Sequence, residues 1–191
     1  MLMDRLPSVI VGVTGASGQL LGWWVVQALL EQTDYPIDLV LSQNAVEVWQ
    51  HEMGDRLIPN HPRVTLHPNS TLSSPIASGS YPTVGMLVAP CSVGTLGRIA
   101  TGTADTLLLR AADVTLKERR PLVLMVRETP LSLIHLRAMQ AVTEAGGVVM
   151  PPVFTMYNHP ESLDDMACEL SLHAVELLGI SVERKRWGYS V

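Results

Sequence analysis

Residues 8–14, SVIVGVT, and the turn GASG at residues 15–18 decide the fold of this chain of 191 residues. The first stretch is apolar and rich in β-branched side chains, which is typical of a strand buried on both faces of a parallel sheet. Residues 19–31, directly after the turn, have the composition of a helix. A buried strand, a glycine turn and a helix in this order predict the opening unit of an α/β fold.

The same alternation continues to the end of the chain, and it predicts a doubly wound, Rossmann-like α/β fold with helices on both faces of a parallel sheet. We expect a single domain over residues 1–191. Five prolines between residues 54 and 83 predict an irregular loop there, and residues 181–191 read as a C-terminal tail. The further predicted strands are 37–41, 84–89, 121–126 and 147–150, and the further predicted helices are 43–53, 104–118, 131–145 and 162–178.

The composition excludes several classes of protein. Hydrophobic residues make up 47% and charged residues 16% of the chain, against about 25% charged in a typical globular protein. This excludes a disordered chain and predicts that part of the thinly charged surface is buried in a homo-oligomer. A net charge of −5 and 5% aromatic residues argue against nucleic-acid binding.

The patterns of cysteine, histidine and hydropathy predict a cytoplasmic protein that binds no metal and has no membrane-spanning segment. The two cysteines form no disulfide framework, and the six histidines include no closely spaced pair of ligands. The longest apolar run, residues 20–30, is too short to span a membrane.

Small and hydroxyl residues follow the ends of several predicted strands. They lie at residues 14–18, at Ser42 and at residues 91–95, and the charged pair Arg127 and Glu128 follows a further strand. In such a sheet ligands bind beyond the carboxyl ends of the strands, where backbone N–H groups of turns and helix starts attract anions. One turn of this kind would be equally consistent with simple capping. Three at matching positions predict a cofactor that carries phosphate.

The turn sequences favour FMN over a nicotinamide dinucleotide. The glycines at positions 12, 15 and 18 do not have the GxGxxG spacing, and no acidic residue follows the second strand to hold a ribose hydroxyl. None of the four tyrosines has a lysine four residues later, so the dyad of short-chain dehydrogenases is missing. A mononucleotide, with one phosphate and no second ribose, fits these turns better.

Charged residues gather between positions 110 and 128. Arg110, Asp113 and Lys117 share one face of a predicted helix, where the simplest interpretation is a solvated or inter-subunit salt-bridge face. Arg127 and Glu128 instead follow a buried strand directly, so we expect them to face a ligand. Tyr157 follows another strand and offers a phenolic donor, although such a residue is more often half-buried packing.

Six motifs together resemble those of the UbiX-type flavin prenyltransferases, in the same order and over residues 8–180. They are TGASG at 14–18, ASGS at 77–80, PCSVGTL at 90–96, RAADVTLKERRPLVL at 110–124, RETP at 127–130 and MPP at 150–152. The resemblance implies a metal-independent transferase that joins the dimethylallyl group of dimethylallyl phosphate to N5 and C6 of reduced FMN. The product, prenylated FMN, is the cofactor of UbiD-type decarboxylases. The resemblance also implies a dodecamer with sites between subunits.

The matching motifs assign roles to individual residues. Ser17 would lie near flavin N5, Glu128 would transfer a proton, and Glu52 would assist within the site. The residues implied to bind FMN are Gly15, Ala16, Ser17, Ser42, Ser92, Val93, Gly94, Thr95 and Arg127. Those implied to surround the prenyl phosphate are Arg110, Lys117, Arg127, Glu128 and Tyr157, together with position 173.

Position 173 departs from the family pattern. The family usually has arginine or lysine there for the substrate phosphate, whereas this chain has His173. Histidine titrates near pH 6.5, so it is only partly cationic at pH 7 unless a bound phosphate raises its pKa.

Three other functions compete with the prenyltransferase. The first is an FMN-dependent cysteine decarboxylase of the phosphopantothenoylcysteine type, in which His51 would be the candidate catalytic histidine. The second is a carrier that delivers FMN without catalysis, which would need none of Arg110, Lys117, Glu128 and Tyr157. An NAD-linked reductase is the least favoured, because its binding residues are missing.

Overall fold

The computed structural model describes residues 6–186 and 188. Over this range the chain forms one parallel sheet of six strands in the order β3-β2-β1-β4-β5-β6. The strands are β1 Ser8–Val13, β2 Ile37–Leu41, β3 Val64–His67, β4 Thr83–Cys91, β5 Leu122–Val126 and β6 Val148–Val149. The helices are α1 Gln19–Gln32, α2 Gln43–Glu52, α3 Val93–Ala100, α4 Leu107–Lys117, α5 Leu133–Glu144 and α6 Leu163–Glu176, with a short 3-10 helix η1 at Pro75–Ala77.

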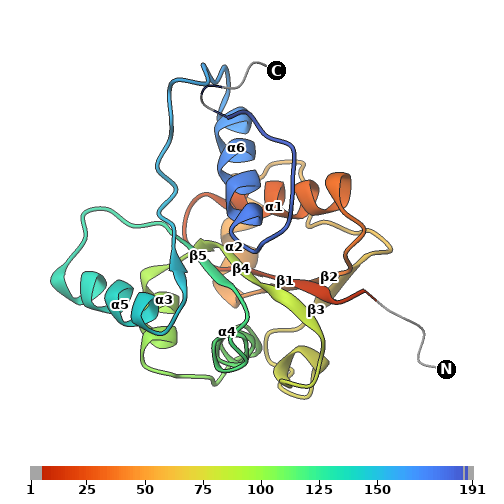
Figure 1. The fold of residues 1–191 in the computed structure, drawn as a ribbon, viewed down its shortest axis with the longest axis vertical. Helices are drawn as coiled ribbons and strands as arrows, with labels where there is room; N and C mark the ends of the chain where they lie inside the picture. The colour runs from red at the N-terminus through yellow and green to blue at the C-terminus, as the bar shows by residue number, and fades with distance from the viewer. Residues whose placement is uncertain (1–5, 187, 189–191) are drawn as a thin grey trace.

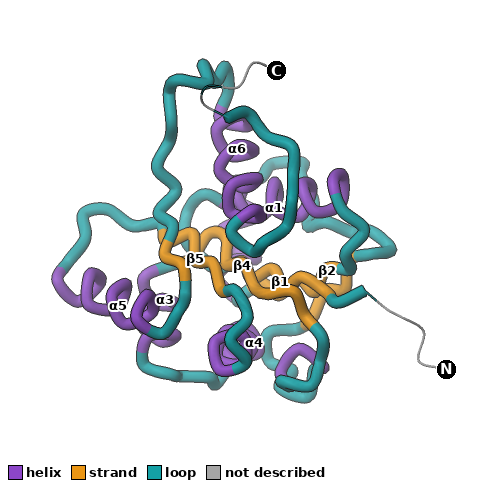
Figure 2. Tube along the Cα trace, viewed as in Figure 1, coloured by secondary structure: helices purple, strands orange, loops and turns teal. Residues whose placement is uncertain are grey.

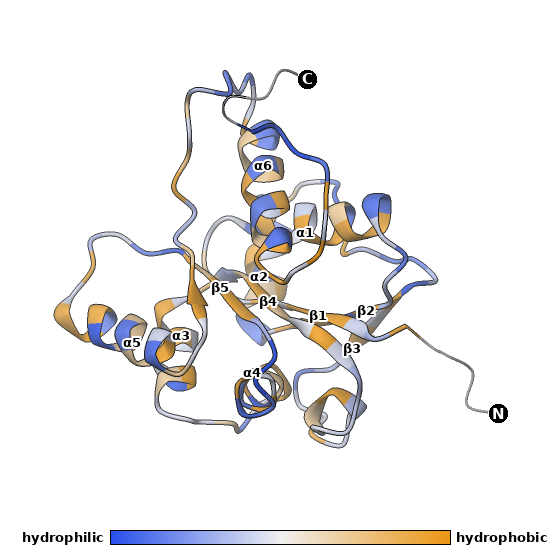
Figure 3. Cartoon of the chain, in the orientation of Figure 1, coloured by the Kyte–Doolittle hydropathy of each residue, from blue (hydrophilic) through white to orange (hydrophobic). Residues whose placement is uncertain are grey.

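Two hydrophobic layers enclose the sheet, which confirms the predicted doubly wound fold. Successive strand residues point to opposite faces, so Val9, Val11 and Val13 pack under α1, α2 and α6, while Ile10 packs against α4 on the other face. Figure 1 shows α1 and α6 on one side of the sheet and α3, α4 and α5 on the other. The strands are the most continuously apolar part of the fold (Figure 3). No helix in the described part of the chain is long and apolar enough to cross a membrane.

The direction in which the chain adds strands reverses beside β1. From β1 the chain moves outward to β2 and β3, and then returns to add β4, β5 and β6 on the other side of β1. The connections leaving β1 and β4 therefore diverge, and a crevice opens beyond the carboxyl ends of these two strands. Ligands bind at this point in open α/β sheets.

Three elements differ from the sequence prediction. The segment 54–83, expected to be an irregular loop, contains β3 and η1. Residues 93–100 form a helix that was not predicted, and the helix expected over 104–118 begins only at Leu107. The edge strand β3 has four residues, and Leu66 is 53% exposed, so it lacks a clear alternation of apolar and polar residues. The helix α3 has glycine at two of its eight positions, and these lower its helix propensity, so its sequence is typical of a loop.

A buried polar network attaches the edge strand to the sheet. The carboxylate of Asp38 in β2 is 4% exposed and pairs with Nε2 of His67 in β3 at 2.7 Å. Nδ1 of His67 contacts the hydroxyl of Ser74 at 3.0 Å, and the hydroxyl of Tyr81 donates to Asp38 at 3.2 Å. These bonds compensate the burial of a carboxylate and fix the long connection between β3 and β4.

The predicted C-terminal tail is attached to the fold as far as it is described. Ile180 and Val182 are buried in the layer under α1 and α6. Glu183 forms two backbone hydrogen bonds with the side-chain amide of Gln32, at 2.6 and 3.2 Å. Residues 1–5 of the predicted domain and residues 187 and 189–191 of the predicted tail lie outside the described residues.

Two helix glycines give a matched test of packing. A Cβ at Gly22 in α1 would lie 2.4 Å from the carbonyl oxygen of Ala89 in β4, whereas a Cβ at Gly97 in α3 would meet no atom within 4 Å. We expect Gly22→Ala to lower the free energy of unfolding by about 1–3 kcal/mol, because α1 must move off the sheet. Gly97→Ala should raise it by up to about 1 kcal/mol. Urea unfolding of both variants measures the difference, and equal effects would contradict it.

Candidate active site

Thr14 joins the ends of β1 and β4. Its hydroxyl donates to the carbonyl of Pro90 at 2.8 Å and accepts a hydrogen bond from the amide of Ser92 at 2.8 Å. The side-chain amide of Gln19 donates to the carbonyls of Thr14 and Ala16, each at 2.8 Å. These bonds hold the turn after β1 beside the turn after β4, as the sequence pattern predicts.

Glu52, at the end of α2, reaches back to the turn after β1. Its Oε2 accepts hydrogen bonds from the amides of Gly18 at 2.8 Å and Gln19 at 3.0 Å. Partial burial raises the pKa of the Glu52 carboxyl, but hydrogen bonds from Ser17, Gln19 and Gly18 and the charge of Arg127 outweigh it and hold the pKa below its usual value. Glu52 is therefore an anion in contact with Ser17.

Close packing explains the glycine that follows Thr14. A Cβ at Gly15 would lie 2.6 Å from Cβ of Asn44 and 3.2 Å from its backbone carbon. The turn after β1 therefore approaches the first turn of α2 as closely as only glycine permits. Gly15 thus brings its turn against Ser42, the N-cap of the same helix.

Ser42 and Ser92 cap the helices that start at the crevice. The Ser42 hydroxyl accepts from the amide of Ala45 at 3.2 Å, and the Ser92 hydroxyl accepts from the amide of Thr95 at 3.3 Å. The Ser92 hydroxyl also lies 3.1 Å from that of Thr95. Both serines therefore cap a helix, and their position at the crevice would also allow them to contact a cofactor. The starts of α2 and α3 place backbone N–H groups where a phosphate would bind.

A cavity of about 460 Å³ opens beside the first turn and combines polar and apolar walls. Its polar residues include Ser17, Glu52 and Arg127. The amide of Arg127 donates to the carbonyl of Cys91 at 3.0 Å, which holds the end of β5 next to that of β4. The apolar wall consists of Leu20, Leu21, Met53, Pro152, Phe154, Leu163 and Ala167. We call this space the turn cavity.

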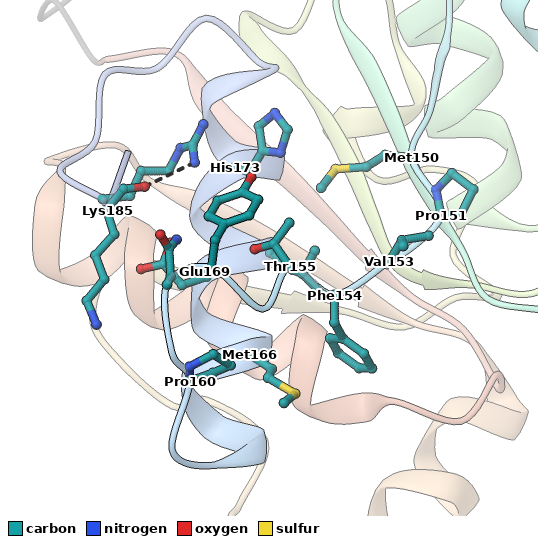
Figure 4. Close-up of a pocket in the computed structure, with 14 residues that line it drawn as sticks. Met150, Pro151, Val153, Phe154, Thr155, Pro160, Met166, Glu169, His173 and Lys185 are labelled. Carbon is teal, nitrogen blue, oxygen red and sulfur yellow. Dashed lines mark hydrogen bonds between the residues drawn. The ribbon is translucent and has the colours of Figure 1, made fainter. Parts of the chain in front are cut away.

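A second cavity, of about 300 Å³, lies between α6, the segment after β6 and the segment after α6 (Figure 4). Tyr157, His173, Arg184 and Lys185 line it, and so does Phe154, which also lines the turn cavity. The two cavities are therefore neighbours on either side of one aromatic side chain. We call this second space the basic cavity. The segment after β6 runs alongside α6 in Figure 2.

His173 is a poor cation in this setting. Burial lowers the pKa of its imidazole, and the nearby charges of Arg184 and Arg186 lower the pKa further, while Glu176 opposes them. The imidazole is therefore mostly neutral at pH 7 and above.

The structure brings some of the predicted site residues together and separates others. Ser17, Glu52 and Arg127 line the turn cavity, and Tyr157 and His173 line the basic cavity. Glu128, next to Arg127, is exposed and accepts a hydrogen bond from the amide of Thr129 at 3.0 Å. Gly15, Ala16, Ser42, Ser92, Val93, Gly94 and Thr95 form the turns and helix starts at the ends of β1, β2 and β4.

Arg110 and Lys117 lie elsewhere in the chain. Arg110 bonds to Asp113 at 2.6 Å and donates to the carbonyl of Ala77 at 3.2 Å, while Lys117 pairs with Glu118. These contacts place both residues against the segment 77–80, which leads into the amino end of β4. Arg127 follows the carboxyl end of β5 and lines the turn cavity, whereas Arg110 and Lys117 line neither the turn cavity nor the basic cavity.

Phe154, Arg184 and Lys185 are among the cavity residues that were not predicted as site residues. Phe154 lies in a segment without regular structure, and Arg184 and Lys185 belong to the predicted tail. The cluster of basic residues at positions 184–186 was the available signal, but a local pattern does not show that it folds back onto α6. No group of three or more potential metal ligands occurs among residues 6–186 and 188.

Replacing Glu52 with glutamine tests its place in the turn. Its pKa is lower in the folded chain, so the ionised carboxylate stabilises the fold above its usual pKa of 4.5, and this contribution is lost as the pH falls through the lower folded value. Since the side chain is exposed, we expect Glu52→Gln to lower the free energy of unfolding by less than about 1 kcal/mol at pH 7. Denaturant titrations should show this difference shrinking below pH 4.5; a constant difference would contradict the assignment.

Comparison with known proteins agrees with this geometry. The Flavoprotein family model matches residues 2–172. The crystal structure of AnUbiX (PadA1) in complex with FMN and dimethylallyl pyrophosphate is 37% identical in sequence, with a TM-score of 0.87 over 97% of this chain and 100% of that chain. A dodecameric FMN-dependent UbiX-like decarboxylase from Escherichia coli O157:H7 is 39% identical, with a TM-score of 0.87 over 95% of this chain and 100% of that chain.

Curated relatives of this chain are named flavin prenyltransferase UbiX. The flavin prenyltransferase UbiX of Neisseria meningitidis is 47% identical over 173 residues, which cover 90% of this chain and 91% of the relative. That of Escherichia coli K12 is 48% identical over 166 residues and 86% of each chain. The structure of a PPC decarboxylase mutant is only 18% identical, with a TM-score of 0.65, and shares the fold alone. The resemblance seen in the sequence is confirmed: this chain belongs to the UbiX family of flavin prenyltransferases.

Proposed function

We propose that this chain transfers the dimethylallyl group of dimethylallyl phosphate to N5 and C6 of reduced FMN, and that the prenylated FMN serves a UbiD-type decarboxylase. The observation that carries the proposal is the pair of neighbouring cavities. One adjoins the strand-end turns that suit a flavin mononucleotide, and the other is lined by basic side chains. Phe154 lies between them, where an allyl group would connect the phosphate to the flavin.

The turn cavity suits an FMN molecule in several ways. Gly15 lets the turn after β1 approach α2, and the starts of α2 and α3 offer amide donors to one phosphate. Apolar side chains form the wall that a flavin ring would contact. We assign FMN binding to Gly15, Ala16, Ser17, Ser42, Ser92, Val93, Gly94, Thr95 and Arg127.

Reduced FMN would supply the nucleophilic nitrogen and the ring carbon that form the two new bonds. The chain's part is to bind the leaving phosphate and to exclude water from the electron-poor allyl carbon. The carbon–oxygen bond of the substrate would break with its electron pair leaving on phosphate, and cations of the site would stabilise the charge that develops there. Leu20, Phe154 and Leu163 provide an apolar wall on which the allyl group meets no water.

Proton transfer in the second bond-forming step falls to the carboxylates. Ser17, held by Glu52, would lie near N5, and Glu52 fixes its hydroxyl and the two adjacent amides. Glu128 follows Arg127 and is exposed at the same sheet edge, where it would take or return a proton. The proton that would leave the flavin ring carbon is matched by one that would add to the allyl double bond, and phosphate leaves with the electron pair of the broken carbon–oxygen bond, so no oxidant or reductant is needed.

A second copy of the chain would complete the phosphate site. Arg110 and Lys117 line neither cavity of their own chain, so they would reach such a site only in a neighbouring subunit. Exposed apolar residues on and next to α5 support an assembly, with Ile134 76% exposed. The related Escherichia coli structure is described as dodecameric, and we propose the same assembly here. Two free cysteines fit the proposed cytoplasmic location.

Mass spectrometry tests the reaction directly. Under anaerobic conditions the purified protein with reduced FMN and dimethylallyl phosphate should release a flavin heavier by one C5 prenyl unit. Omitting the prenyl phosphate is the control. Unmodified flavin in every sample would refute the prenyltransferase and favour an FMN-dependent cysteine decarboxylase or a carrier.

Position 173 should control substrate affinity above neutral pH. The pKa of His173 lies below its usual value of 6.5, so the imidazole is neutral at pH 8. We expect His173→Arg to lower the KM for dimethylallyl phosphate at pH 8 by about tenfold, because it adds a permanent cation to the basic cavity. The variant His173→Gln, neutral at every pH, should match the wild type at pH 8. An unchanged KM in His173→Arg would show that position 173 does not touch the phosphate.

A further inference from the structure

The segment after α6 carries cations into the basic cavity. Arg184 and Lys185 line this cavity together with His173, and Figure 4 shows Lys185 and His173 arising from different segments around it. Glu169 is the acidic residue in the same lining. The lining of the cavity thus has two basic side chains, one carboxylate and a histidine whose pKa is lowered.

The position of Arg184 is fixed from both sides. Glu183, directly before it, bonds to Gln32 of α1 through both of its backbone polar groups. The guanidinium donates through Nε to Oε2 of Glu176 at 2.5 Å, and its side chain is only 20% exposed. Arg184 is therefore held against α6 and keeps its charge at the cavity wall.

Glu176 does not neutralise the arginines that it holds. Its other oxygen, Oε1, pairs with Arg186, so one carboxylate serves two guanidinium groups. The hydrogen bonds of Arg184 to other described residues use Nε and Nη1, the latter a long one of 3.4 Å to the carbonyl of Lys185. Within that part of the chain, Nη2 is left for a ligand.

We propose that Arg184 binds the phosphate of the prenyl substrate and supplies the permanent positive charge that His173 does not, with Glu176 as the residue that positions it. A guanidinium binds a phosphate through two parallel N–H groups, which a neutral imidazole cannot do. This inference rests on the proposed function for the identity of the substrate. The site itself requires only a phosphate monoester.

Arg186 provides a matched control. It shares the carboxylate of Glu176 and the same segment, but it does not line the basic cavity. The variants Arg184→Gln and Arg186→Gln each remove one charge and one bond to Glu176, so a purely structural effect should be similar in both. FMN binding is monitored by flavin fluorescence, and a variant that still binds FMN is folded.

Two readouts are compared, namely the affinity for inorganic phosphate measured by calorimetry and the KM for dimethylallyl phosphate. We expect Arg184→Gln to weaken phosphate binding and raise the KM by tenfold or more, with a smaller change in kcat. Arg184→Lys should lose less, and Arg186→Gln should change either value by less than about threefold. Equal losses in Arg184→Gln and Arg186→Gln, or none in Arg184→Gln, would overturn the proposal.

The double variant His173→Arg/Arg184→Gln tests whether one charge replaces the other. Restored phosphate affinity relative to Arg184→Gln supports the exchange, and no recovery contradicts it. Phosphate binding is measured without turnover, so it distinguishes failure of the proposed function from failure of the role assigned to Arg184. A wild type that binds phosphate through Arg184 but adds no prenyl group refutes the proposed function alone. A wild type that prenylates flavin while Arg184→Gln binds phosphate normally refutes the role of Arg184 alone.

Discussion

The hydroxyl of Thr14 is the interaction on which the candidate site depends. It donates to Pro90 and accepts from Ser92, so it ties together two turns that are 76 residues apart in sequence. Thr14 itself is 1% exposed, so its hydroxyl would be costly to leave unpaired. These two bonds fix the end of β1, the end of β4 and the start of α3 relative to one another. The positions of the amides and hydroxyls at the crevice follow from this arrangement of the turns.

Glu52 shows how one side chain serves both the fold and the chemistry. Its carboxylate receives two amides at the start of α1, so it stabilises the turn from outside the sheet. The same contacts keep it ionised beside Ser17, and Arg127 adds a nearby positive charge. A charged acceptor that is already satisfied by the backbone is rigid, and a rigid neighbour fixes the direction of the serine hydroxyl.

The sequence was sufficient for those parts of the fold that are determined locally. β1, the glycine turn, α1 and β2 have strong patterns and occur where predicted, and the strand-end turns identified the crevice. β3 was missed because a four-residue edge strand depends on pairing with β2 and on the contact between His67 and Asp38, not on its own pattern. α3 was missed because its two glycines weaken helix propensity, while Ser92 and the sheet stabilise its first turn.

The basic cavity could not be predicted for the same reason. α6 ends just before Gly179, whose φ of 81° reverses the chain, and apolar side chains then dock the following segment beside α1. Only this return path brings Arg184 next to His173, and a local reading of residues 181–191 as a tail contains no such information. Long-range packing, and not residue type, made these basic residues part of a cavity.

The separation of Arg110 and Lys117 from Arg127 has a consequence for assemblies that mix variants. In the proposed assembly, each site borrows its cations from α4 of another copy, so a chain carries one half of two different sites. A substitution on α4 would leave its own turns intact and impair the site of its neighbour. A mixed assembly of an α4 variant and a variant of the turns would then regain some complete sites, although neither variant forms a complete site alone.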